Sequence, residues 1–250
     1  MLASAWGWWI LIAGLAAGGL AGLGLLAAMR RTPFPPLLAF WWVMNRLYCR
    51  WWFRLRLLGE CTVPAEGPVI VAANHTCGID PLLVIACIPH RIPAYLVAEE
   101  YANPPLVGGL MKRVGCIPVR RDGQDTSATR AALRHLKAGN VLGIFIEGRI
   151  APPGETLDAK DGAAMLAVHS GARVVPVHIS GTRWDDNVFR SFLRRHRARV
   201  RFGEPIDLCP GGVKPAREQI PRISAMLLDR IRALAPAPPL RPGGRRKAGH

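Results

Sequence analysis

A histidine and an aspartate five residues apart have the side chains needed for general-base catalysis. His75 directly follows a run of apolar residues, and Asp80 lies where a helix is expected to begin. A neutral imidazole can take a proton from an alcohol when a carboxylate holds its tautomer and orientation and stabilises the imidazolium that forms. A turn between the two residues could bring them into contact. The pair alone is a weak signal, because this spacing also arises for structural reasons.

Two arginines in the second half of the chain could hold an anion. Arg121 and Arg149 each follow a strand-like segment, and a guanidinium group can grip a phosphate with two parallel donors. Glu147 could bind a substrate hydroxyl or pair with these arginines. The alternatives are surface arginines on solvated loops and a purely structural ion pair at Glu147.

The cysteines bear on both catalysis and metal binding. Cys77 lies two residues beyond His75, so a covalent Cys and His route is chemically possible. We expect Cys77 instead to be a small packing residue, since free cysteines are most often buried. The six cysteines include no Cys-x-x-Cys pair. The sequence therefore predicts no metal site and no disulfide framework.

Short apolar runs alternate with helical patterns through residues 59–234. The predicted strands are 69–73, 94–98, 117–119, 141–146 and 174–179, with a possible edge strand at 200–202; the predicted helices are 81–88, 105–114, 127–138, 161–170 and 216–234. This alternation predicts an α/β fold with a largely parallel mixed sheet flanked by helices. His75 would lie at the end of a strand, where an open α/β sheet presents its site.

Four blocks of residues occur in an order that resembles a known family. Asn74, His75 and Asp80 match the motif Asn-His-x-x-x-x-Asp, and the later blocks are residues 115–121, 145–149 and 175–177. Together they resemble the glycerol-3-phosphate and 1-acylglycerol-3-phosphate acyltransferase family, over roughly residues 60 to 180. Four ordered blocks are a specific signal even though each block alone is weak.

The resemblance implies both a reaction and a set of site residues. It implies transfer of a fatty acyl group from acyl-CoA or acyl carrier protein to the hydroxyl of 1-acylglycerol 3-phosphate, which gives phosphatidic acid in phospholipid biosynthesis. His75 would be the general base and Asp80 its orienting partner. The implied substrate-binding residues are Asn74, Arg121, Glu147, Gly148 and Arg149. No cofactor is implied beyond the acyl donor.

Two departures from the family pattern affect the identity of the acceptor. Ile146 stands where the family usually has Pro, and Arg149 directly follows Gly148 without the usual Thr. This variant also resembles the acyltransferase part of bacterial 2-acylglycerophosphoethanolamine acyltransferase fusions. The alternative acceptor is therefore another lysophospholipid, such as lysophosphatidylethanolamine. From another class, a catalytically silent membrane or lipid-binding protein is the alternative.

The N-terminal residues predict attachment to a membrane. Residues 1–29 carry no charged side chain, and seven of the eight tryptophans fall within the first 52 residues. Residues 1–29 are expected to be a transmembrane anchor or a buried monotopic helix. Arg30 and Arg31 follow the apolar run, so the positive-inside tendency places the catalytic domain on the cytoplasmic face of the inner membrane.

The next segment, residues 30–58, is expected to form an interfacial amphipathic helix. Arg46, Arg50 and Arg54 recur every four residues and would share one helix face, while much of the remaining surface is apolar. The alternative is a helix that packs on the catalytic domain, and the two descriptions are compatible.

The overall charge predicts an anionic partner. Lys and Arg number 33 against 17 Asp and Glu, a formal charge of +16, and seven of the arginines lie between residues 183 and 201. Membrane phospholipids, a lysophospholipid or an acidic carrier fit this charge. No nucleic-acid recognition motif accompanies it, so no nucleic-acid partner is expected. Residues 235–250 are expected to be a disordered basic tail.

Overall fold

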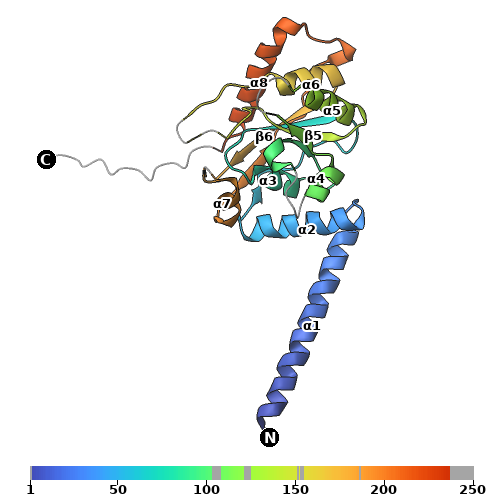
Figure 1. The fold of residues 1–250 in the computed structure, drawn as a ribbon, viewed down its shortest axis with the longest axis vertical. Helices are drawn as coiled ribbons and strands as arrows, with labels where there is room; N and C mark the ends of the chain where they lie inside the picture. The colour runs from blue at the N-terminus through green and yellow to red at the C-terminus, as the bar shows by residue number, and fades with distance from the viewer. Residues whose placement is uncertain are drawn as a thin grey trace, which may run out of the picture.

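A long N-terminal helix leads into an α/β domain in the computed structural model (Figure 1). The structure describes residues 2–102, 108–120, 125–150, 152, 155–185 and 187–236, with side chains in the first helix from residue 16 onward and at residue 14. Helix α1 (Leu2–Arg30) projects away from the domain, and α2 (Pro36–Trp51) crosses its base. The predicted anchor, residues 1–29, and the predicted tail, residues 235–250, therefore lie partly outside the described residues.

Within the described parts of the chain, no helix combines the length and the apolarity needed to cross a bilayer.

Seven strands form one mostly parallel sheet, in the order β1-β7-β6-β2-β5-β3-β4. The strands are β1 (Arg56–Leu57), β2 (Val69–Ala73), β3 (Ala94–Ala98), β4 (Ile117–Val119), β5 (Val141–Phe145), β6 (Arg173–Ser180) and β7 (Arg199–Phe202). Among the strand pairs of the described residues, β6 and β7 run antiparallel and the others run parallel. The predicted α/β fold is confirmed, but β7 is not an edge strand, because β1 pairs with its outer side.

Helices cover both faces of the sheet. On one face, α5 (Thr126–Lys137), α6 (Gly162–Ser170) and α8 (Ile220–Ala233) enclose a core that includes Ile70, Leu142 and Val174. On the other face, α2 and α3 (Asp80–Cys87) contribute to a second core with Val71, Val175 and Val200. The two cores use alternate residues of β2 and β6, as expected for strands buried on both sides.

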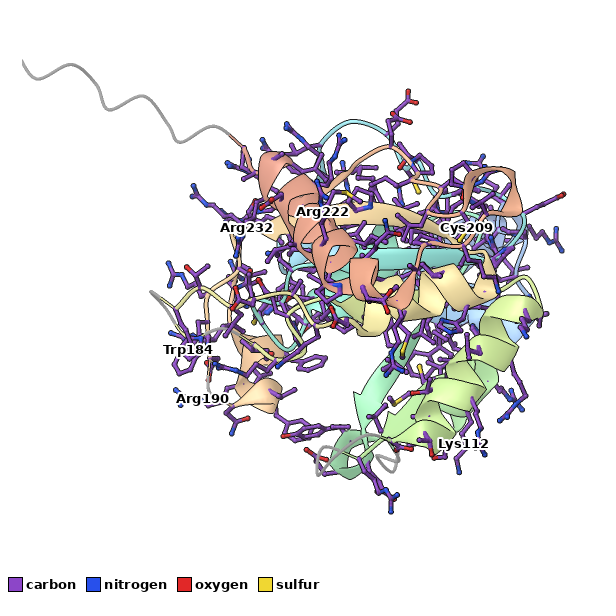
Figure 2. All side chains as sticks on the ribbon, turned by 90° about the horizontal axis from the view of Figure 1, so that it is seen from above. Lys112, Trp184, Arg190, Cys209, Arg222 and Arg232 are labelled. Atoms are coloured by element: carbon purple, nitrogen blue, oxygen red, sulfur yellow. The ribbon has the colours of Figure 1, made fainter. Side chains whose placement is uncertain are left out.

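Two short helices complete the described elements near the sheet. Helix α4 (Gly108–Val114) precedes β4, while α7 (Val188–Leu193) follows β6 and has no counterpart among the predicted helices. The Asn187 side chain accepts hydrogen bonds from the first backbone N–H groups of α7. Figure 2 shows Arg190 on α7, well separated from Arg222 and Arg232 on α8.

Helix α2 is docked on the end of α3. Trp42 and Asn45 donate side-chain hydrogen bonds to backbone carbonyls of α3 and its C-terminal cap, and Arg46 donates to the carbonyl of Ala86 at 2.9 Å. The bond to Ala86 satisfies one of the last carbonyl groups of α3, which a helix end leaves unpaired. Arg46 therefore binds protein, in agreement with the alternative of a helix that packs on the catalytic domain.

The helix predicted within residues 30–58 is shorter than expected. It ends at Trp51, and Arg54 lies beyond it with a φ of 48°, so Arg54 does not share a helix face with Arg46 and Arg50. The chain turns here because Arg56 and Leu57 join the sheet as β1.

Candidate active site

His75 and Asp80 meet at the carboxyl end of β2. The imidazole Nδ1 of His75 lies 3.0 Å from Oδ2 of Asp80. His75 follows β2 directly, and Asp80 is the first residue of α3, so the intervening turn brings the two side chains together. The His75 side chain is 17% exposed and that of Asp80 is fully buried. The imidazole is thus partly accessible, while its carboxylate partner is shielded from water.

The Asp80 carboxylate is held by several donors. Its Oδ2 accepts the backbone N–H groups of Thr76 at 2.6 Å and Cys77 at 2.8 Å, and the Thr76 hydroxyl lies 3.2 Å from both oxygens. The N-terminus of α3 adds the positive end of a helix dipole. A buried carboxylate held by these donors can keep the imidazole in one orientation.

Two aromatic side chains form a stack that begins on one face of the His75 imidazole. The ring of Phe145 stacks on His75 with centroids 3.9 Å apart and an angle of 10°, and Tyr95 stacks on Phe145 at 5.6 Å. Parallel pairing of β2 with β5 places Phe145 beside Ala73, two residues before His75. Phe145 was singled out from the sequence only as the first residue of the block 145–149. Phe145 lies near the end of a strand-like run, just before the position where a parallel sheet presents its site, and this pattern could have indicated a role beside His75.

Asn74 is committed to the sheet. Its side-chain Nδ2 donates to the carbonyl of Ile179 at 2.9 Å, and its Oδ1 accepts the Ile179 N–H at 2.7 Å. The amide therefore replaces a backbone pair between the ends of β2 and β6. Asn74 thus joins the residue before His75 to β6. Because its amide already makes hydrogen bonds to Ile179 through both the nitrogen and the oxygen, the predicted contact of Asn74 with substrate stays a prediction.

Glu147 lies beside His75 and binds its backbone, whereas the sequence also allowed a pairing of Glu147 with an arginine. Its Oε2 accepts the backbone N–H of His75 at 2.9 Å. Gly148 follows at φ 74°, a left-handed conformation that favours glycine, and its N–H donates to the carbonyl of Phe145 at 3.0 Å. This tight turn after β5 carries Glu147 to the His75 end of the sheet.

The two predicted phosphate-binding arginines are placed differently. The exposed guanidinium of Arg149 is ion-paired with Glu155 and not with Glu147. Arg121 lies outside the described residues, so its distance from His75 stays untested. The structure thus brings His75, Asp80 and Glu147 together, while Arg149 is exposed and paired with Glu155.

Cys77 is buried behind the pair. Its side chain is inaccessible and packs with Ile79, Leu83 and Val84 in the core below the sheet. Burial raises the pKa of the Cys77 thiol above its ordinary value, which disfavours the nucleophilic thiolate. The environment favours the packing role over the covalent route.

The arrangement is suited to proton transfer. A proton on His75 Nδ1 that is directed to the Asp80 carboxylate leaves a lone pair on Nε2, the atom that could take a proton from a hydroxyl. Across the described parts of the chain, no group of three or more His, Cys, Asp or Glu side chains is placed to hold a metal ion.

Comparison with known proteins places this geometry in a family. A family model described as Acyltransferase matches residues 54–180, about half of the chain. A 1-acyl-sn-glycerol-3-phosphate acyltransferase of Bacillus subtilis is 24% identical over 181 residues, which cover 72% of this chain and 87% of that protein. A protein of the same name from Borreliella burgdorferi is 28% identical over 134 residues, 52% of each chain.

A solved structure shares the fold. The crystal structure of the 1-acyl-sn-glycerophosphate (LPA) acyltransferase PlsC from Thermotoga maritima superposes with a TM-score of 0.61 at 22% identity, covering 86% of this chain and 89% of the other. The matched family region contains β2, the His75 and Asp80 pair, β5 and β6. The chain therefore belongs to the acyltransferase family and is an O-acyltransferase.

Proposed function

We propose that this protein transfers a fatty acyl group from an acyl thioester to the free hydroxyl of 1-acylglycerol 3-phosphate, giving phosphatidic acid. The observation that carries the proposal is the 3.0 Å contact between His75 Nδ1 and the buried Asp80 carboxylate. The names of the Bacillus subtilis and Borreliella burgdorferi relatives support the choice of acceptor.

The proposed reaction needs one base and no acyl-enzyme. His75 Nε2 removes the acceptor's hydroxyl proton as the oxygen attacks the thioester carbonyl, which forms the new C–O bond. The tetrahedral intermediate collapses with cleavage of the C–S bond, and the imidazolium returns its proton to the leaving thiolate. Asp80 stabilises the imidazolium between these steps. The acyl thioester is already activated, so no cofactor is required.

The acceptor phosphate is assigned to the arginine side of the site. Arg121 and Arg149 supply planar donors suited to a terminal phosphate. Arg149 lies one residue beyond Gly148, and its pairing with Glu155 would be exchanged for substrate phosphate. Glu147 and Gly148 are proposed to line the acceptor side through the turn that follows β5.

Helix α2 supports attachment of the enzyme to a membrane surface. One side of α2 packs on α3, while a stripe on the other side exposes apolar residues at helical spacing: Leu37, Trp41, Met44, Leu47 and Trp51. Such a stripe is typical of a helix that lies in the headgroup region. We assign the acyltransferase to the cytoplasmic membrane, with α1 and α2 as its membrane-embedded part and the catalytic domain facing the cytoplasm.

A panel of acceptors tests the function directly. Purified protein in detergent is incubated with acyl-CoA or acyl carrier protein and with lysophosphatidic acid or lysophosphatidylethanolamine, and the lipid products are identified by mass spectrometry. Preferred formation of phosphatidic acid is expected. Preferred acylation of lysophosphatidylethanolamine would shift the acceptor, and no product from any combination would support a lipid-binding protein without catalysis.

A further inference from the structure

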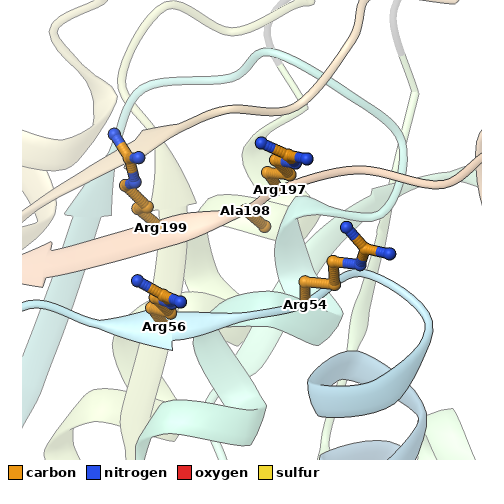
Figure 3. Close-up of a pocket in the computed structure, with 5 residues that line it drawn as sticks. All are labelled: Arg54, Arg56, Arg197, Ala198 and Arg199. Carbon is orange, nitrogen blue, oxygen red and sulfur yellow. The ribbon is translucent and has the colours of Figure 1, made fainter. Parts of the chain in front are cut away.

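A groove lined by four arginines lies apart from the His75 site. The side chains of Arg54, Arg56, Arg197 and Arg199, together with Ala198, border a concavity of about 290 Å³. Figure 3 shows that the four side chains come from two neighbouring segments and extend toward the same side. All four are exposed, and no carboxylate lines the groove.

The backbone forces these charges together. Arg56 pairs in register with Arg199, and the N–H of Arg56 donates to the carbonyl of Ala198 at 3.0 Å. Residues two apart on an extended segment share a face, so Arg197 lies on the side of Arg199, and Arg54 lines the same groove from the turn before β1. Like charges directly opposite each other in a sheet are destabilising. Among the described residues, no ion pair relieves any of the four arginines.

The backbone at Arg54 is also unusual. Its φ of 48° is the only positive value among the described non-glycine residues. A left-handed conformation is unfavourable for a long side chain and marks positions where function is a reasonable hypothesis. Here it carries the guanidinium of Arg54 toward that of Arg197, at the mouth of the groove (Figure 3).

The groove and α2 lie on opposite sides of the sheet, which argues against a lipid headgroup as the ligand of the groove. Phe53 and Leu55 are buried with Cys49 of α2 in the core on one side of the sheet. Arg56 alternates with Leu55 and points to the opposite side, and Arg54, whose backbone is left-handed, lines the same groove. A bilayer contacted through α2 would therefore meet the other face of the sheet, and the groove is open to a ligand arriving from water.

The distance from His75 fits the two ends of one substrate. Ser180, at the carboxyl end of β6, pairs with Arg199, so the groove lies at the same end of the sheet as His75. β6 and β7 separate β2 from β1. At about 5 Å per strand, β7 and β1 lie roughly 10–15 Å across the sheet from β2, the strand that ends just before His75. An extended pantetheine arm has a comparable reach.

We propose that the Arg54, Arg56, Arg197 and Arg199 groove binds the phosphate groups of a coenzyme A thioester while the acyl carbonyl lies at His75. This rests on the proposed function and names its donor. Coenzyme A carries a diphosphate and a 3′-phosphate, which match a concave cluster of guanidinium donors. The small volume of the groove suits a phosphorylated nucleotide better than the flat acidic surface of a carrier protein.

Truncated donors test the site. Arg56→Ala and Arg199→Ala should each raise the KM for acyl-CoA about tenfold or more, because each removes charge-assisted hydrogen bonds to phosphate. The KM for acyl-pantetheine, which has the thioester without the nucleotide, should not change, nor should kcat. Arg222→Ala on α8 removes the same charge outside the groove and should leave both KM values unchanged (Figure 2).

A binding measurement separates this site from the reaction. Titration calorimetry of the full chain should show coenzyme A binding that Arg56→Ala weakens and Arg222→Ala does not; thermal unfolding checks that each variant is folded. Wild-type protein that binds coenzyme A in this way but transfers no acyl group would refute the proposed function and keep the site. An active enzyme whose acyl-CoA KM is the same in all variants would refute the site alone.

Two other outcomes would assign the groove to another ligand. A raised KM for acyl carrier protein with an unchanged KM for acyl-CoA would make it a protein-docking surface. Weaker binding of the Arg56→Ala and Arg199→Ala variants to vesicles of phosphatidylcholine with phosphatidylglycerol, with unchanged coenzyme A affinity, would make it a lipid headgroup site. Either result contradicts the proposal.

Discussion

Asp80 connects the His75 and Asp80 pair to the backbone that positions it. The same Oδ2 atom faces His75 Nδ1 and the N–H groups of Thr76 and Cys77. The carboxylate therefore shapes the turn between β2 and α3 while it orients the imidazole. At the scale of single residues, substitutions should separate these two tasks.

His75→Ala should remove the base and leave the turn intact. Since the backbone donors to Asp80 remain, we expect kcat to fall by about 10²–10⁴-fold with little change in the melting temperature. Cys77→Ala is the neighbouring control and should keep its activity, because the Cys77 thiol is buried. Turnover close to wild type in folded His75→Ala protein would refute the mechanism, and an acyl group trapped on Cys77 would support the covalent route.

Asp80→Asn should impair both catalysis and folding. An amide oxygen at the position of Oδ2 would still accept the backbone N–H groups of Thr76 and Cys77, but more weakly than a carboxylate does, because it carries no charge. We expect a large loss of kcat and a loss of roughly 1–3 kcal/mol in the free energy of unfolding, from the weaker hydrogen bonds to these buried donors. Chemical denaturation measures the second effect, and an unchanged midpoint would show that the turn does not depend on the carboxylate.

Arg121→Lys and Arg149→Lys test the acceptor phosphate. Lysine keeps the charge but loses the planar pair of donors, so the KM for lysophosphatidic acid should rise more than the KM for the acyl donor. Lysophosphatidylethanolamine, whose phosphate is already esterified, should lose less. Unchanged kinetics with lysophosphatidic acid in both variants would refute the arginine clamp and the preference for that acceptor.

At the scale of elements, parallel strand pairing builds the site. β2 and β5 end side by side, which stacks Phe145 on His75, and β3 adds Tyr95 behind Phe145. Gly143 makes this possible, because a Cβ at that position would overlap the Tyr95 ring. The ring stack beside His75 therefore depends on a glycine in the middle of β5.

Gly143→Ala should displace Tyr95 and disturb the stack behind His75. We expect a loss of about 1–3 kcal/mol in stability from overpacking, together with a lower kcat. Gly162→Ala at the start of α6 is the matched control, because an added Cβ there meets no atom within 4 Å. Wild-type kcat and melting temperature in Gly143→Ala would show that the ring stack has no part in positioning His75.

At the scale of the whole molecule, buried histidines make stability depend on pH. Burial lowers the pKa of His178 and His196 below the ordinary value of 6.5, and nearby Arg201 adds to the effect at His178. A histidine with a lower pKa in the folded state takes up a proton on unfolding. Each therefore opposes folding as pH falls below 6.5.

The melting temperature should fall between about pH 7 and pH 5 for this reason. His178→Gln removes one of the titrating groups, so the decrease should become shallower than in the wild type. Differential scanning fluorimetry over this range provides the measurement. A melting temperature that rises on acidification would contradict the assignment of neutral buried histidines.

The sequence by itself determined most strands of the sheet and the chemical pair, but neither β1 nor α7. Alternating apolar and helical patterns predicted β2, β3 and β4 with their observed ends, because local periodicity reports which faces are buried. The His75 and Asp80 pair was predictable because Asp80 follows His75 by only five positions and a single turn joins them. The family resemblance depended on the same local motifs.

Only the tertiary structure decided which distant groups meet. Asn74 binds Ile179, Arg46 binds the end of α3, and the β1 and β7 pairing collects the groove arginines from segments more than 140 residues apart. Arg54 appeared to continue a helical repeat, yet it belongs to the connection into the sheet. Strand order and helix docking follow from nonlocal packing, which leaves no periodic trace in the sequence, so these contacts could not be predicted from local patterns.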